Sequence, residues 1–151
     1  MIGHSFALAS LGLLAACASS GVPSSSGVGK GITTDVNLTL NAPVTTSYGQ
    51  SGGYAPPTIT VAVGTQIRFV NTDGFQHTAT LVRNATRSPA GSPFGVAALM
   101  QQGANLSGGF SSGVLAPGSS SQTITADRAG TYLFGCFFHY AAPMRAVIVA
   151  Q

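Results

Sequence analysis

Charge is the scarcest property of this sequence, which has 151 residues but only three acidic residues and six lysines and arginines. The basic residues are scattered along the chain, and the formal net charge is only +3. A nucleic-acid-binding surface requires basic residues gathered on one face, so the composition argues against a nucleic-acid partner. Cysteine is also scarce, since Cys17 and Cys136 are the only two, and the surroundings of each indicate a use other than a disulfide.

Long hydrophobic runs are missing as well. The apolar run over residues 6–16 is shorter than the roughly 20 apolar residues that a membrane-spanning helix needs. A short apolar run followed by small residues is typical of a cleaved signal peptide. The run closes on Leu14-Ala15-Ala16-Cys17, which resembles a bacterial lipobox, although residues 1–5 lack the usual lysine or arginine.

The lipobox resemblance implies that cleavage leaves Cys17 as a lipidated first residue. We therefore expect residues 1–16 to be a signal peptide, residues 17–31 to be the lipidated cysteine with a flexible Ser/Gly tether, and residues 32–151 to be the folded domain. The protein would then face the periplasm from a bacterial membrane, with the outer membrane favoured because Ala18 is not aspartate. The alternative is an ordinary signal peptide that releases a soluble periplasmic or secreted protein.

Short alternating runs rich in Gly, Ser, Thr and Val predict an all-β sandwich or barrel. The expected strands are residues 34–40, 58–63, 66–70, 77–82, 122–126, 131–135 and 145–149. Leu40 and Val63 continue the alternation of the first two strands and are expected to point inward. Residues 42–57 contain many Gly and Pro and are expected to be mostly loop. Residues 84–118 show little pattern beyond a possible short helix at 97–102.

Three potential metal ligands lie within nine residues, directly after the strand expected at 131–135. They are Cys136, His139 and Met144. Each alone has an ordinary explanation as a buried or solvated side chain. Together, a thiolate, an imidazole and a thioether are the ligands that copper prefers. The chain has three histidines, and His4 lies in the signal segment, so a second imidazole would come from His77.

The ligand loop resembles that of the cupredoxins, and of their plastocyanin-like members in particular. Their pattern of Gly-x-Tyr-x-Tyr/Phe-x-Cys-x-x-His followed by Met is carried by Gly130, Tyr132, Phe134, Cys136, His139 and Met144. The resemblance implies a Greek-key β-sandwich or barrel with one type 1 (blue) copper ion. The implied ligands are His77, Cys136, His139 and Met144, each histidine binding through Nδ1.

The same resemblance implies a function in electron transfer. His139 would be the port through which electrons pass to transient redox partner proteins, and the protein would be a monomer. Asn71 and Thr78 are candidates to brace the ligand loop or to bond the Cys136 sulfur. Aromatic and small residues of the loop, such as Phe138, would form an apolar rim around His139.

An enzyme is not expected. Copper oxidases need further histidine ligands, and a binuclear site would need a second cysteine in the loop. A nucleophilic Cys136 paired with one histidine is possible chemistry, but it leaves the other histidine and Met144 without a role. Copper storage or delivery without redox turnover would use the same four residues and stays open as an alternative.

Replacing Met144 with Leu should test the axial position. We expect the variant to keep copper, because the other three ligands hold it, and to show a higher reduction potential, because a weak axial ligand tunes that potential. Voltammetry of the copper-loaded protein measures this. Loss of copper, or an unchanged potential, would show that Met144 is not a weak axial ligand.

Overall fold

The computed structural model describes residues 33–151. Twelve strands and one short 3₁₀ helix, η1, follow one another in this part of the chain. In order they are β1 (Thr33–Leu38), β2 (Val44–Thr46), β3 (Gly49–Ser51), β4 (Tyr54–Ala55), β5 (Thr58–Val61), β6 (Gln66–Asn71), β7 (Thr80–Val82), η1 (Val96–Leu99), β8 (Gln101–Asn105), β9 (Gly109–Ser112), β10 (Ile124–Thr125), β11 (Gly130–Gly135) and β12 (Arg145–Ala150). The predicted all-β class is therefore confirmed.

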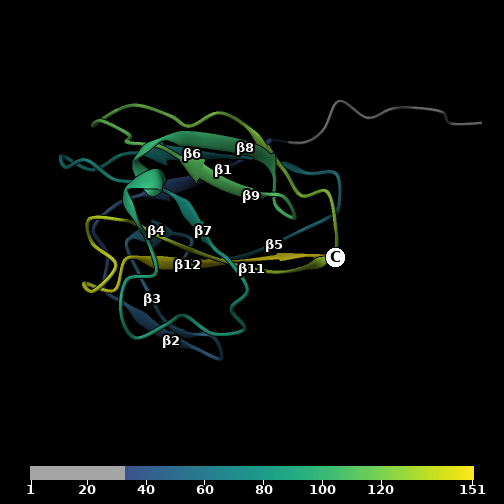
Figure 1. The fold of residues 1–151 in the computed structure, drawn as a ribbon, viewed down its shortest axis with the longest axis horizontal. Coiled ribbons are helices and arrows are strands. Elements are labelled where there is room, and N and C mark those ends of the chain that lie inside the picture. The colour runs from purple at the N-terminus through teal and green to yellow at the C-terminus, as the bar shows by residue number, and fades with distance from the viewer. Residues whose placement is uncertain (1–32) are drawn as a thin grey trace, which may run out of the picture.

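Ten of the strands form one sheet that folds over on itself. The strand order is β4-β1-β6-β10-β8-β9-β7-β11-β12-β5, and β2 pairs separately with β3. In Figure 1, β1, β6, β8 and β9 form an upper layer, and β5, β11 and β12 form a lower one. Strand β11 pairs antiparallel with β12 over its whole length, from Gly130 opposite Ala150 to Gly135 opposite Arg145. The loop that joins them lies at the end of the molecule opposite the C-terminus (Figure 1).

Aromatic rings fill the space between the two layers. Phe69 of β6 is fully buried, and its ring centroid lies 5.1 Å from that of Phe134, 5.9 Å from that of Phe110 and 6.1 Å from that of Tyr54. Burying such a ring contributes about 1.5–3 kcal/mol, so this cluster is a large part of the core. It also joins β6, which leads to His77, to β11, which leads to Cys136.

The strand predictions hold best where alternation is regular. Strands β1, β5, β6, β11 and β12 lie within a few residues of their expected positions. Two inward-facing assignments are wrong: Leu40 is 70% exposed and Val63 is 47% exposed. Both residues lie just past the end of their strands, where side chains no longer alternate between the core and the solvent.

Two segments contain strands that the sequence did not indicate. Residues 42–57 hold three short strands, β2 to β4, in place of the expected loop. Residues 84–118 hold η1, β8 and β9, and η1 is a single short turn that begins one residue before the helix expected at 97–102. Every residue of β8 is exposed, so the strand has no hydrophobic pattern by which to recognise it.

The signal peptide and tether expected at residues 1–31 lie outside the described residues. Within residues 33–151, no helix is both long enough and apolar enough to cross a bilayer.

Candidate metal centre

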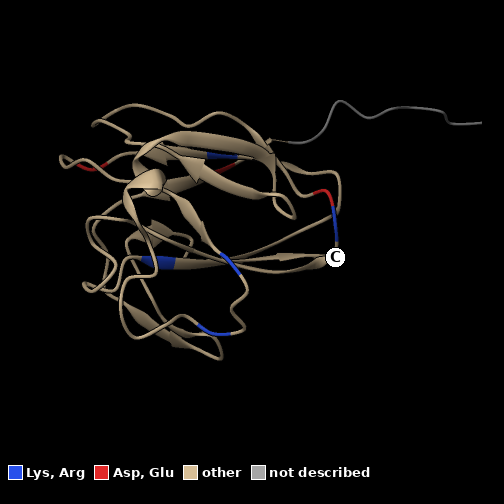
Figure 2. Ribbon diagram, viewed as in Figure 1, with Lys and Arg blue, Asp and Glu red and all other residues tan. Residues whose placement is uncertain are grey.

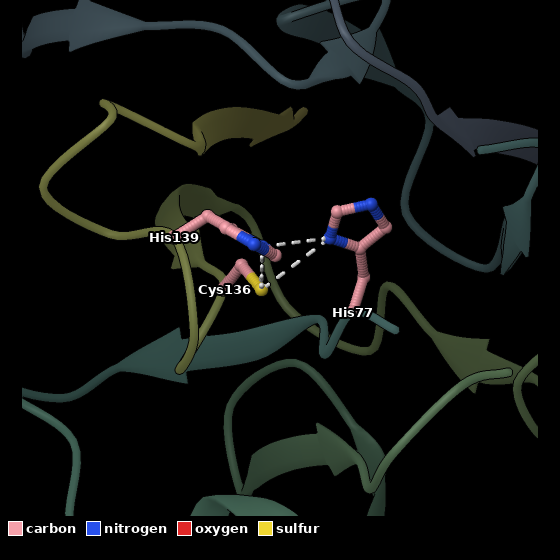
Figure 3. A group of neighbouring side chains, drawn as sticks. All are labelled: His77, Cys136 and His139. Carbon is pink, nitrogen blue, oxygen red and sulfur yellow. Dashed lines mark hydrogen bonds between the residues drawn. The ribbon is translucent and has the colours of Figure 1, made fainter. Parts of the chain in front are cut away.

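Three side chains converge at the end of the molecule where β11 meets β12. The Nδ1 atoms of His77 and His139 are 3.1 Å apart, and each lies 3.7 Å from the Cys136 sulfur. Figure 3 shows the three side chains turned toward one another, two from the loop after β11 and one from the segment before β7. His77 and Cys136 are fully buried, and His139 is half-buried.

The donor set and its spacing fit a metal ion. A point equidistant from atoms 3.1, 3.7 and 3.7 Å apart lies about 2.0 Å from each, close to the 2.0–2.3 Å of typical metal–nitrogen and metal–sulfur bonds. Two imidazole nitrogens and one thiolate in a triangle form the in-plane ligand set of a blue-copper site. The geometry therefore brings together three of the four ligands that the sequence predicted.

His77 is held by a polar residue at the end of β6. The buried Asn71 side chain donates hydrogen bonds to the carbonyls of Phe75 (2.7 Å) and Leu115 (2.9 Å), while its Oδ1 accepts one from the Asp73 N–H (3.0 Å). The backbones of His77 and Leu115 exchange two hydrogen bonds, of 2.8 and 3.1 Å. These bonds brace the turn that presents His77, rather than the ligand loop or the Cys136 sulfur that the sequence suggested for Asn71.

Cys136 is held by Thr78. The backbone N–H of Thr78 donates to the Cys136 sulfur at 3.3 Å, and the Thr78 hydroxyl accepts a hydrogen bond from the Phe137 N–H at 2.9 Å. Hydrogen bonds to a thiolate favour its charged form, which is the form that binds metal. The prediction that Thr78 braces the loop and bonds the sulfur is confirmed.

Met144 closes the ligand loop. Its carbonyl accepts a hydrogen bond from the Cys136 N–H (3.1 Å), and its N–H donates to the His139 carbonyl (3.0 Å). The Met144 side chain is buried and packs against Gly53, where an added Cβ would overlap the Met144 Cγ. Gly53 has φ +71°, a conformation that favours glycine, so this close approach suits no other residue.

A family sequence model described as copper-binding proteins of the plastocyanin/azurin family matches residues 42–151, most of the chain. The chain belongs to this family. Its members, the cupredoxins, bind one copper ion, and His77, Cys136, His139 and Met144 form a plausible type 1 site for it.

Solved structures of several cupredoxins are similar to this chain. A purple cupredoxin from Nitrosopumilus maritimus superposes with a TM-score of 0.50 at 16% identity, covering 78% of this chain and 98% of its own. Plastocyanin from Dryopteris crassirhizoma has a TM-score of 0.48 at 21% identity, and the match covers 78% of this chain and 100% of the plastocyanin. Auracyanin from Roseiflexus castenholzii has a TM-score of 0.49 at 24% identity, and the match covers 82% of this chain and 99% of the auracyanin. No curated protein sequence matches the chain significantly. The family match and the superposition with a TM-score of 0.50 confirm the predicted cupredoxin-like fold.

Two charged residues of this cupredoxin contact the candidate site, and the sequence indicated neither contact. Asp73, in the turn between β6 and His77, places its Oδ2 at 2.9 Å from the Nε2 of His77. Arg145 is buried, donates to the Tyr140 carbonyl and lies 4.1 Å above the Tyr140 ring. The aspartate–histidine spacing of four residues was the one available signal for Asp73. The Arg145 contacts depend on the folded loop and have no local signature.

Burial and neighbouring charge shift the pKa values of the site. The pKa of His139 lies below its ordinary 6.5, because burial and then the charge of His77 disfavour the imidazolium, against a smaller opposing effect of Asp73. Burial raises the pKa of Asp73, but hydrogen bonds from His77 and from the Gly74 N–H outweigh it and leave a net decrease. Both shifts favour the forms that a cation site needs, a neutral imidazole and an ionised carboxylate.

The His139 shift predicts how the metal-free protein responds to acid. Unfolded chains bind this proton with a pKa near 6.5, whereas the folded protein binds it only at lower pH, so acid favours unfolding. The free energy of unfolding of the wild-type protein should fall as pH drops from about 7.5 to 5.5.

Urea unfolding of the metal-free protein at several pH values measures this slope. His139→Gln lacks the group and should show a flatter dependence over the same range. A variant slope as steep as that of the wild type would contradict the assignment.

Proposed function

We propose that the protein is a one-electron carrier that binds a single type 1 copper ion through His77, Cys136, His139 and Met144. The observation that carries the proposal is the triangle of His77 Nδ1, Cys136 Sγ and His139 Nδ1, with sides of 3.1, 3.7 and 3.7 Å. Two imidazoles, a thiolate and an axial thioether form the ligand set of blue-copper electron-transfer proteins. Copper bound there would supply reversible one-electron exchange.

The surrounding residues keep this site in one geometry. Hydrogen bonds join Asn71, in the turn before His77, to Leu115, and join Thr78, just before β7, to Cys136. The backbone of Met144 forms hydrogen bonds with both Cys136 and His139. A site held on several sides rearranges little when its charge changes, which favours electron transfer. The same rigidity and the burial of His77 and Cys136 argue against a site that releases its metal readily.

Features of the rest of the molecule support a carrier over an enzyme. Two surface hollows, of about 230 and 510 Å³, share the lining residues Leu81, Val82 and Arg83, and neither is lined by a proposed ligand. Cys136 is fully buried, so a substrate could not reach its sulfur for nucleophilic attack. Cupredoxins are typically electron carriers, which favours the same function here.

We infer that redox partners dock transiently, one carrier monomer at a time, at the end of the molecule that bears His139. Phe138 is 43% exposed, and its ring centroid lies 6.2 Å from that of His139. Phe75 and Val114, on the two loops that Asn71 joins, are also exposed. Figure 2 shows few charged residues at this end. An uncharged apolar rim suits short-lived contacts in which the half-buried His139 lies close to the partner.

We also propose that Cys17 is lipidated and that the domain faces the periplasm on its tether. The lipobox-like residues Leu14 to Cys17 support this. Metabolic labelling with a radioactive fatty acid tests it. Label should be found in the wild-type chain and be lost in Cys17→Ser, which should also leave the membrane fraction. A wild-type chain without label would contradict lipidation.

Voltammetry of the copper-loaded protein tests the carrier function. A Cys17→Ser chain, soluble and with its metal ligands intact, should give a reversible one-electron wave, and the double variant Cys17→Ser/Cys136→Ala should give none because the thiolate is gone. Copper should also stay bound through repeated redox cycles. Absence of a wave, together with transfer of the copper to a metal-free acceptor, would identify a delivery protein and contradict the proposal.

A further inference from the structure

A buried carboxylate contacts the side of His77 that faces away from the other ligands. Asp73 Oδ2 lies 2.9 Å from His77 Nε2, and the two side chains are 8% and 0% exposed. The other ring nitrogen of His77, Nδ1, faces Cys136 and His139. Asp73 therefore contacts the proposed copper site only through the ligand His77. The family resemblance seen in the sequence assigned Asp73 no role at the site.

The carboxylate is fixed in this position by the turn that contains it. The Asp73 N–H donates to Asn71 Oδ1 at 3.0 Å, and the Gly74 N–H donates to Asp73 Oδ1 at 2.5 Å. One carboxylate oxygen is thus used by the backbone, and the other is left for His77. Among the described residues, His77 is also the only side chain that forms a hydrogen bond with this carboxylate.

This contact determines which nitrogen of His77 carries the proton. An ionised carboxylate only accepts hydrogen bonds, so Nε2 must donate and Nδ1 keeps its lone pair. That lone pair points into the triangle of ligand atoms. The metal-free protein therefore already holds His77 in the tautomer that a metal at Nδ1 requires, and such a partner also makes the imidazole a stronger donor.

The two histidines differ in this respect. His139 is half-buried, and no hydrogen bond to its Nε2 is found within residues 33–151. His77 is sealed from solvent. Its Nδ1 faces the ligand cluster, and its Nε2 contacts Asp73. The negative charge is thus placed behind the buried histidine, away from the half-buried one.

We infer that Asp73 is a positioning residue for the copper site: it holds His77 in its ligating tautomer and lowers the reduction potential by favouring the more highly charged oxidised state. The inference rests on the proposed function. A negative charge near a redox centre stabilises Cu(II) over Cu(I), because the oxidised ion carries one more positive charge. Loss of comparable carboxylate partners weakens metal binding 10–100-fold.

Asp73→Asn separates this role from a purely structural one. The amide has the same shape and can still accept the Gly74 hydrogen bond, but it carries no charge. If Cu(II) binding weakens 10–100-fold while Cu(I) binding is unchanged, the reduction potential rises by about 59 mV for each factor of ten. The matched control is Asp127→Asn, which removes the same charge from an aspartate that bonds Ser107 at the opposite end of β11.

Two measurements decide the matter. Voltammetry should show a clear rise in potential for Asp73→Asn, a much smaller one for Asp127→Asn, and recovery of most of the shift in Asp73→Glu, which keeps the charge. Nitrogen-15 NMR of the metal-free protein should show a single Nε2–H tautomer of His77 in the wild type and a mixture in Asp73→Asn. Equal potential shifts in the two asparagine variants, or an unchanged His77 tautomer, would overturn the inference.

The NMR measurement also separates this inference from the proposed function. It needs no copper, so it reports on the Asp73–His77 contact even if the protein carries no electrons. A wild-type protein without a reversible wave would contradict the carrier function alone. If Asp73→Asn does not fold, Asp73→Glu serves as the test instead. The glutamate keeps the charge, so a shift in potential no larger than that of the Asp127→Asn control supports a role for charge. A large shift contradicts it.

Discussion

Three electron-rich atoms, His77 Nδ1, Cys136 Sγ and His139 Nδ1, lie within 3.7 Å of one another in a largely buried place. Such a grouping is unfavourable by itself, because lone pairs repel and buried polar groups lose their hydration. The fold keeps them together through hydrogen bonds that come from outside the triangle. Asn71, Thr78 and the β11–β12 pair each fix one side of it. The three atoms would hold a cation between them, and its charge would offset this cost.

The site has a sealed side, at His77, and an open side, at His139. His77 is buried behind Asp73 and its turn, where its orientation and charge environment are controlled. His139 is half-buried beside the exposed Phe138, on the face where we propose that redox partners dock. On a third side, the buried Arg145 donates a hydrogen bond to the Tyr140 carbonyl in the ligand loop. The Tyr140 hydroxyl in turn donates to the Pro89 carbonyl. The long segment before η1 is thereby fastened to the metal loop.

The candidate ligands could be predicted because their identity and order are local properties of the sequence. Cys136, His139 and Met144 lie in one loop, and His77 was the only remaining histidine outside the segment expected to be a signal peptide. The supporting contacts were harder to predict because they join distant segments, as when Leu115 pairs with His77. Asp73 stands in the turn-type sequence Asn71-Thr72-Asp73-Gly74, which already explains an aspartate there, so its contact with His77 could not be recognised from the sequence. Strand β8 was missed because its residues are all exposed and follow no alternation.

An absorption spectrum of the purified protein after addition of Cu(II), with ferricyanide to keep it oxidised, tests the central claim most directly. Thiolate coordination by Cys136 should give an intense charge-transfer band toward the orange-red end of the spectrum, and ascorbate should bleach it. Reoxidation should restore the band. A protein that binds copper tightly with no such band would contradict a type 1 site, and a protein that binds no copper would return His77, Cys136 and Met144 to ordinary structural roles.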